Sequence, residues 1–583
     1  MQQGCIRKMR VRPCVFCRTI SLAYFPCPGY SNPIFINLMF RTIRTFSMER
    51  IELSFITGAP APHKRVDTRR VLLFSRVYSG GLTGMEGYVV QVEADVSPGL
   101  PSFHMVGYLA SEVREAEERV RTGIRNSGFR LPSMRVTVNL SPANVRKDGT
   151  GCDLPVAVAV LASYGVIEPT LLKDSAFLGE LGLDGRIKPV RGVLSMVLAM
   201  RRAGMSRCFL AEENIAEGLA VEQIEIIKVR SIGELVDLLN RPDQIKPSVR
   251  STDGGEESVY AVDFSEVNGQ KMVRRATEVA VAGFHNILYI GPPGSGKSMI
   301  ARRIPTIMPE LTQAEQLEVS QVYSICGLLP QGRALMRERP FRAPHHTISA
   351  QALTGGGMIP RPGEISLASR GVLFLDELPE FEKKTLEILR QPMEDRKVTV
   401  ARVQGTCEFP AHFMLAAALN PCPCGYYPDR QKCTCSDLQV RKYLGKISRP
   451  LLDRIDLCVE AAPVSYHDIR RQEVNESSSS IRERVERARM IQEKRFSGTG
   501  IIFNSEMGNR EIRSFCRLGD QEEAFLQMVF QRLGLSARGC QKLLRVARTI
   551  ADLDGQDKIQ KLHLVEAVGY RDLEERYWRR EES

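Results

Sequence analysis

The chain has 583 residues, of which 43% are hydrophobic and 25% are charged. This composition is typical of globular proteins and excludes a collagen, a coiled-coil rod or a chain without stable structure. No apolar run approaches the roughly 18 residues that cross a bilayer, so we expect neither a membrane-spanning protein nor a membrane partner. Fifteen cysteines are too few for a disulfide scaffold of this length and favour a cytoplasmic protein with reduced thiols or a metal site.

The formal net charge of +12 is concentrated at the N-terminus, because residues 1–76 contain 13 Lys and Arg against 3 Asp and Glu. This segment shows no sustained helical or strand period, and its Cys14-x-x-Cys17 pair alone is weak evidence for a metal or redox site. Two interpretations remain open. The segment is a basic DNA-binding arm, or it is a disordered extension upstream of a translation start near Val71 or Met85. The near-neutral remainder of the chain gives no indication of nucleic-acid binding through net charge.

Residues 77–240 are predicted to form an α+β domain. Strand-like alternation, small-residue helices and a turn at Asp184-Gly185 follow one another, and Ser111 is placed to cap a helix over residues 110–121. Residues 241–262 are polar and rich in Pro and Gly, which indicates a linker.

A second domain is predicted over residues 263–465. Apolar strands alternate there with helices, which favours an α/β fold with a mostly parallel sheet. Residues 466–583 are predicted to be almost wholly helical.

One segment matches the phosphate-binding pattern G-x-x-x-x-G-K-[ST] and lies between a short apolar strand and a helix. The loop consists of Gly291, Pro292, Pro293, Gly294, Ser295, Gly296, Lys297 and Ser298. Glycines let backbone N–H groups approach phosphate oxygens, Lys297 supplies a positive charge to the β- and γ-phosphates, and the Ser298 hydroxyl can ligate Mg²⁺. The pattern therefore predicts binding of ATP with Mg²⁺.

Two further strands end in polar residues suited to hydrolysis. Four apolar residues precede Asp376 and Glu377, about 80 residues after the loop. Asp376 is expected to hold Mg²⁺ and Glu377 to polarise the attacking water. A later apolar strand ends in Asn420, whose side chain can orient that water.

Four cysteines lie within 14 residues as two C-x-C pairs: Cys422, Cys424, Cys433 and Cys435. Four thiolates at close spacing can enclose Zn²⁺ and staple a loop, although C-x-C is tighter than the usual C-x₂-C spacing. We predict a structural zinc site, with free thiols as the alternative. His345 and His346 are expected to make polar contacts and not to bind a metal.

Residues 395–406 read as a β-hairpin that carries Arg396, Lys397 and Arg402. Such a hairpin could present positive charge to the phosphates of DNA, or it could be an ordinary solvated surface.

Several segments carry a closer resemblance: residues 263–270, 339–346, 362–368, 371–381, 420–426 and 547–553. Together they resemble the magnesium-chelatase-like AAA+ family called YifB or ComM, from about residue 77 to the C-terminus. The resemblance implies a Lon-protease-like domain of the S5 type, a central AAA+ ATPase core and a C-terminal helical lid. It also implies a hexameric ring that acts on DNA as a branch-migration helicase in recombination or natural transformation.

The resemblance also implies roles for single arginines. Arg454 would reach the ATP site of a neighbouring subunit as an arginine finger, and Arg538 would sense the nucleotide from the lid, with Arg545 as the rival. Two residues depart from the family pattern: Ser369 stands where His is expected, and Arg449 where Gly is expected.

A Lon-like domain raises the question of peptidase activity. Residues 147–155 contain no Ser at the expected place, and Cys152 has no evident base in the sequence, so we predict a structural thiol and no protease. Two other functions remain as alternatives: an ATPase that remodels a protein or metal-insertion partner without DNA, and a nucleotide-dependent scaffold.

Overall fold

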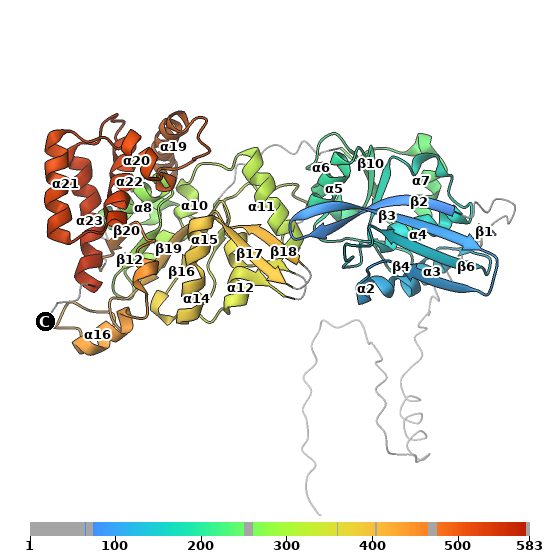
Figure 1. The fold of residues 1–583 in the computed structure, drawn as a ribbon, viewed down its shortest axis with the longest axis horizontal. Coiled ribbons are helices and arrows are strands. Elements are labelled where there is room, and N and C mark those ends of the chain that lie inside the picture. Colours follow the sequence, from blue (N-terminus) through green and yellow to red (C-terminus); the bar gives the residue numbers. More distant parts are fainter. Residues whose placement is uncertain are drawn as a thin grey trace, which may run out of the picture. The chain divides into compact units, whose positions relative to one another are not determined.

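The computed structural model describes residues 64–65, 74–249, 260–330, 332–357, 360–402, 405–463 and 475–578 (Figure 1). Most of the predicted N-terminal extension and half of the predicted linker therefore lie outside the described residues. The first long strand begins at Phe74, three residues before the predicted start of the first domain, because Phe74, Ser75 and Arg76 already pair with the next strand.

The N-terminal region contains a mixed seven-stranded sheet with the order β11-β10-β7-β2-β3-β6-β4. The β2–β3 and β3–β6 pairs are antiparallel and the other neighbours are parallel. The strands are β2 (Phe74–Thr83), β3 (Glu86–Ser97), β4 (Ser102–Val106), β6 (Arg135–Ser141), β7 (Ser175–Leu178), β10 (Arg207–Ala211) and β11 (Glu225–Val229). Four short strands lie outside this sheet: β1 (Lys64–Arg65) pairs with β5 (Phe129–Arg130), and β8 (Glu180–Leu181) forms a hairpin with β9 (Ile187–Lys188).

Helices cover both faces of this sheet. Every residue of α4 (Asp153–Ser163) is buried, which its run of Ala, Val and Leu explains, and α5 (Val193–Arg202) packs in a separate hydrophobic cluster. The remaining helices are α2 (Ser111–Arg114), α3 (Ala116–Asn126), α6 (Ile215–Leu219) and α7 (Ile232–Leu239). The predicted cap was wrong: Ser111 is the first helical residue, and Ala110 holds the N-cap position without a side-chain bond.

The central region contains a parallel five-stranded sheet with the order β13-β16-β19-β12-β20. Its strands are β12 (Ile287–Ile290), β13 (Phe341–Arg342), β16 (Val372–Leu375), β19 (Met414–Leu419) and β20 (Leu457–Glu460). Beta-branched residues, Leu and Ala make β12, β16 and β19 buried throughout, as expected for strands with both faces covered. The parallel α/β core predicted from the alternating pattern is confirmed.

Short helices and two hairpins surround this sheet. The helices are α8 (Lys271–Gly283), α9 (Lys297–Ala301), α10 (Ile304–Ile307), α11 (Gln313–Cys326), α12 (Ala350–Thr354), α13 (Glu364–Leu367), α14 (Lys383–Ile388), α15 (Arg390–Asp395), α16 (Asp437–Leu444) and α17 (Arg449–Leu452). The hairpins are β14–β15 (Gly355–Gly356 and Arg361–Pro362) and β17–β18 (Lys397–Arg402 and Gly405–Pro410). Single 3₁₀ turns occur at Pro169–Leu171, Glu212–Asn214, Pro242–Gln244, Phe264–Glu266, Leu378–Glu380 and Asn504–Glu506.

The C-terminal region is helical, as predicted. Its helices are α19 (Ser478–Arg495), α20 (Asn509–Phe515), α21 (Asp520–Leu533), α22 (Ala537–Leu553) and α23 (Lys561–Trp578). Figure 1 shows them grouped beside α8, and buried residues of both regions form one hydrophobic cluster. Polar contacts reinforce this packing, since Gln492 donates to the Ala282 carbonyl and His285 bonds the Thr549 hydroxyl at 2.8 Å. Among the described residues no helix has the length and apolar character needed to cross a membrane.

Candidate functional site

Three strand ends meet at one edge of the parallel sheet. Gly291 follows β12, Asp376 follows β16 and Asn420 follows β19, and the register pairs Ile290 with Leu419. Because neighbouring parallel strands end at the same edge, side chains predicted from three separate segments lie together there.

The glycine-rich loop adopts a conformation that requires glycine. Gly294 and Gly296 have φ of +76° and +83°, in the left-handed region, and Gly296 immediately precedes α9. Gln270 holds this loop from outside, because its amide Nε2 donates to the Ser295 carbonyl at 3.2 Å and to the Ala462 carbonyl. Gln270 ends one of the segments that carry the family resemblance, but no pattern around it predicts this contact.

Lys297 is buried and folded back into the loop. Its ammonium donates to the carbonyls of Gly291 and Pro292 at 2.7 and 2.8 Å and to Asn420 Oδ1 at 3.2 Å. Burial lowers the pKa of Lys297 to about 8, against the opposing influence of the Asp376 and Glu377 carboxylates. The Lys297 ammonium group is therefore held by neutral carbonyl and amide oxygens. Phosphate oxygens are anionic and would bind this group more strongly.

The Ser298 hydroxyl donates to Asp376 Oδ2 at 2.5 Å. A hydroxyl and a carboxylate at this separation form the oxygen donor set that Mg²⁺ prefers, so the residues fit a nucleotide-bound magnesium ion. The prediction that these two residues form one site therefore agrees with their placement.

Glu377 is an exposed residue with φ of +51°, a conformation that costs energy for any side chain other than glycine. The imidazole Nδ1 of His346 lies 3.5 Å from Glu377 Oε2, so His346 makes the polar contact that we expected of it. The strained residue Glu377 is the second after β16, at the sheet edge where the glycine-rich loop begins.

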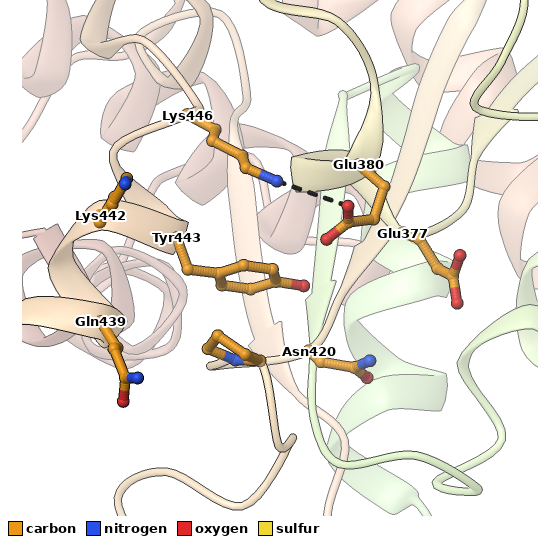
Figure 2. Close-up of a pocket in the computed structure, with 8 residues that line it drawn as sticks. Glu377, Glu380, Asn420, Gln439, Lys442, Tyr443 and Lys446 are labelled. Carbon is orange, nitrogen blue, oxygen red and sulfur yellow. Dashed lines mark hydrogen bonds and ion pairs between the residues drawn. The ribbon is translucent and has the colours of Figure 1, made fainter. Parts of the chain in front are cut away.

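A cavity of about 520 Å³ opens next to Glu377 and Asn420 (Figure 2). Its other walls come from the turn after β16, from Pro423 and from α16 and the turn that follows it, with Glu380, Gln439, Lys442, Tyr443 and Lys446 as lining residues. Lys446 and Glu380 form an ion pair at 3.4 Å across it. These residues were not identified from the sequence, because an amphipathic helix with two lysines carries no specific signal.

The predicted arginine finger has partners in its own chain. Arg454 pairs with Glu394 at 2.7 Å and donates to the carbonyls of Arg390 and Pro450. The partner Glu394 lies 60 residues earlier, so the residues next to Arg454 in the sequence do not indicate this ion pair. The Arg454 side chain is 13% exposed, so an intersubunit role requires it to exchange Glu394 for phosphate.

The two candidate sensor arginines differ in their surroundings. Arg538, near the start of α22, is exposed and forms no ion pair with the described residues. Arg545 is half-buried, its Nε lacks a hydrogen-bond partner among the described residues, and burial lowers its pKa. Arg538 is therefore the one available to a ligand.

The predicted hairpin is present as β17 and β18, over residues 397–402 and 405–410, and Arg396 lies just before it at the end of α15. Two of the three predicted cations are neutralised. Arg396 pairs with the buried Glu506 at 3.0 Å, and Lys397 pairs with Glu408 across the hairpin at 2.7 Å. The side chain of Arg402 lies outside the described residues. The hairpin therefore offers less free positive charge than its sequence indicates.

The four cysteines form one compact cluster. Their sulfur atoms all lie within 4.8 Å of one another, and the separations from Cys422 to Cys424 and Cys433 are 3.3 and 3.7 Å. A tetrahedral zinc ion with Zn–S bonds of 2.3 Å would place its sulfur ligands about 3.8 Å apart. Two backbone N–H groups, of Gly425 and Tyr427, also point at Cys422 Sγ. The donor set and its spacing fit a tetrathiolate metal site.

Within the stretch that resembles Lon-type peptidases, Cys152 and Lys147 are both buried. Burial raises the pKa of the Cys152 thiol to about 12. The neighbouring Lys147 is buried and donates to the carbonyls of Pro142 and Val145. Lys147 is thus near Cys152, but its ammonium group is bound by two carbonyls, and the thiol is not ionised at neutral pH.

Comparison with known proteins agrees with this geometry. Three family models match consecutive parts of the chain: "Subunit ChlI of Mg-chelatase" over residues 92–214, "Magnesium chelatase, subunit ChlI" over 263–469 and its C-terminal model over 475–571. The competence protein ComM of Haemophilus influenzae is 39% identical over 502 residues, which cover 85% of this chain and 97% of ComM. The uncharacterized protein YifB of Escherichia coli K12 is 39% identical over 505 residues, 86% of this chain and 97% of YifB.

The N-terminal sheet region has a more distant relative. A Lon protease of Mycolicibacterium smegmatis is 24% identical over 166 residues, 27% of this chain and 21% of the protease. The fold and the glycine-rich loop define an AAA ATPase of the ChlI-like class. The chain belongs to the magnesium chelatase ChlI family, together with ComM and YifB.

Proposed function

We propose that the protein is an ATP-driven ring motor that acts on branched or single-stranded DNA during recombination or natural transformation. The observation that carries the proposal is the 39% identity to a competence protein over 97% of that protein's length. A hexamer and branch-migration activity follow from the resemblance that the sequence motifs carry. A ring places the ATP site of each subunit against its neighbour, which gives Arg454 a function that a monomer lacks.

In the proposed reaction Lys297 leaves its carbonyl acceptors and pairs with the phosphates of ATP, while loop N–H groups orient them. Glu377 accepts a hydrogen bond from the attacking water, and Asn420 holds that water in line. Ser298 and Asp376 would hold Mg²⁺, which when bound neutralises charge on the phosphates. Arg538 contacts the nucleotide from the helical region.

The four-cysteine cluster is proposed to hold a structural zinc ion. The sulfur separations and the two N–H groups directed at Cys422 support this proposal, since N–H groups stabilise a thiolate more than a neutral thiol. The competing interpretation is four free thiols.

A second function is supported by a specific observation. The family models are those of a magnesium chelatase subunit, and the hairpin cations proposed for DNA binding are paired within the chain. An ATPase that remodels a protein or metal-insertion partner would explain both facts without DNA.

ATP hydrolysis by the full chain, with and without single-stranded and four-way-junction DNA, distinguishes the two functions. Lys297→Ala serves as the blank. A several-fold stimulation that is strongest with the junction and is lost at high salt supports the DNA motor. Robust turnover that no DNA changes contradicts it and favours the remodelling function.

A further inference from the structure

The segment between the first and the last cysteine (residues 422–435, the cysteine loop) contacts the nucleotide site at two places. Pro423 lines the cavity that Glu377 and Asn420 open onto. Gly425 lies directly against Pro293 of the phosphate-binding loop. The proposed metal ligands Cys422 and Cys424 alternate in the sequence with these two contact residues, so the cysteine cluster and the nucleotide site share one short segment.

The contact between Gly425 and Pro293 leaves no space for a side chain. A Cβ at Gly425 would lie 2.4 Å from Pro293 Cδ and 2.9 Å from Cγ, well inside normal van der Waals distance. Because the proline ring is bonded to its own backbone nitrogen, it cannot move aside without moving the phosphate-binding loop. The position of the cysteine loop therefore limits the positions available to Pro293.

One sulfur atom fixes the backbone at this contact. Cys422 Sγ accepts hydrogen bonds from the N–H groups of Gly425 at 3.2 Å and Tyr427 at 3.4 Å. Gly425 has φ of +88°, a conformation that glycine adopts readily. The atom that would bind the metal is thus the atom that orients Gly425.

The far side of the cysteine loop rests on the end of the C-terminal helix. The ring of Tyr427 meets Tyr577 of α23 edge-on at 6.1 Å, and Arg430 lies over the Tyr427 ring at 5.0 Å. Trp578 donates from its indole nitrogen to the Leu444 carbonyl at the end of α16. The cysteine loop is therefore backed by packed side chains and can transmit a displacement to Pro293.

We propose that the metal-bound cysteine loop is a positioning element of the ATP site. Zinc fixes Cys422, Cys422 fixes Gly425, and Gly425 holds Pro293 and with it the phosphate-binding loop. This inference rests on the proposed zinc site and on ATP binding at the loop. It adds that metal occupancy sets the affinity for nucleotide although no cysteine touches the nucleotide.

The first test uses the full chain with a single methyl group added at the contact. Gly425→Ala is compared with Gly498→Ala, a matched control with a similar φ of +78° and no atom within 4 Å of the new Cβ. Zinc content is measured by mass spectrometry, and affinity by titration with Mg²⁺ and a fluorescent N-methylanthraniloyl ATP. We expect Gly425→Ala to keep its zinc and bind this probe about tenfold more weakly, because a small displacement of a positioning loop is enough for such a loss. The control should bind like the wild type.

The second test removes the metal. Chelation of the wild-type chain, and separately Cys433→Ser, should weaken binding of the same probe, and added zinc should restore it in the chelated wild type only. Nucleotide affinity that is equal with and without zinc, or a Gly425→Ala variant that binds like its control, overturns the inference. A zinc-loaded wild type that does not bind the probe contradicts the proposed ATPase itself, and a purified chain without zinc contradicts the proposed metal site.

Discussion

Two buried lysines, one in the N-terminal region and one in the ATPase core, differ in chemistry although their contacts are alike. Lys147 donates to the carbonyls of Pro142 and Val145, and Lys297 donates to those of Gly291 and Pro292. Burial lowers the pKa of both. The groups around the two lysines differ. Lys297 lies near the carboxylates of Asp376 and Glu377, which follow β16, and within an exposed loop. Lys147 lies near the buried, protonated thiol of Cys152.

The comparison shows that a lysine held by carbonyls is not by itself a catalytic group. We expect Lys297 to exchange its carbonyl partners for phosphate, because Pro293 and Gly294 of the same loop are exposed. Lys147 is 2% exposed, and we expect its bonds to the carbonyls of Pro142 and Val145 to hold the turn between these residues.

The largest expected effect comes from removing the functional lysine. Lys297→Ala should lower ATP hydrolysis by about 10³-fold, the upper end of the cost of removing one preorganised charge donor. Steady-state hydrolysis by the full chain measures this effect, with circular dichroism to show that the variant is folded. A fall of less than about tenfold would mean that Lys297, like Lys147, serves the fold.

Arg454 is a second cation that could serve either catalysis, as proposed for Lys297, or the fold, as proposed for Lys147. Its contacts with two carbonyls and with Glu394 are those of a structural residue. We expect Arg454→Ala to lower hydrolysis by about 10²-fold, the lower end of the same range, because the wild-type side chain must first leave Glu394. Mixing Arg454→Ala with Lys297→Ala subunits should restore part of the activity, since each supplies what the other lacks across a subunit interface. Failure of the mixture to recover activity would assign Arg454 a role inside its own subunit.

Most of the nucleotide site could be predicted because each of its parts follows a short apolar strand. Asp376 and Asn420 were found in this way, and parallel pairing then brings them to the loop. Contacts between distant segments could not be predicted. Glu506 neutralises Arg396 from 110 residues away, and Glu394 holds Arg454, so charges that read as free in the sequence are paired in the fold. The residues of α16 that line the cavity match no sequence motif that predicts a binding site.

Lys147 should affect stability and not activity. Lys147→Met removes the hydrogen bonds to the Pro142 and Val145 carbonyls, and each such bond contributes about 0.5–1.5 kcal/mol to stability. We expect a lower midpoint of urea unfolding for the N-terminal region and an unchanged rate of ATP hydrolysis per folded chain. A changed rate at full folding would show that this region influences the ATPase core.

Asp456 lies just before β20 and pairs with Lys542 of α22, so it links the ATPase sheet to the C-terminal helices. We expect the stability that this buried carboxylate contributes to decrease at acidic pH. Burial alone would raise the pKa of Asp456, but the His285 imidazole, with Nδ1 3.7 Å from Oδ2, and the Lys542 charge at 4.0 Å outweigh it and hold the pKa well below its usual range. The carboxylate therefore contributes stability above the unfolded-state pKa of about 4, and this contribution is lost as pH falls towards the lower folded-state value. Asp456→Asn should unfold about 2 kcal/mol more easily than the wild type at pH 7. The difference between the two proteins should begin to narrow as pH falls below about 4 and should close only near the lower folded-state pKa of Asp456. A difference that does not narrow as pH falls would exclude this origin.

The smallest expected effect is at Cys152, where the comparison predicts no change. A thiol with a pKa of about 12 has only about one thiolate in 10⁴ to 10⁵ molecules at pH 7.5. Cys152→Ser should therefore leave ATP hydrolysis unchanged, and neither protein should cleave a casein substrate. Iodoacetamide should label Cys152 more slowly than the half-buried Cys407, because alkylation requires both exposure and a thiolate. Rapid labelling of Cys152 would show that this thiol is accessible and ionised. Casein cleavage that Cys152→Ser abolishes would show that the N-terminal region is a peptidase, and that Lys147, like Lys297, lies in a catalytic site.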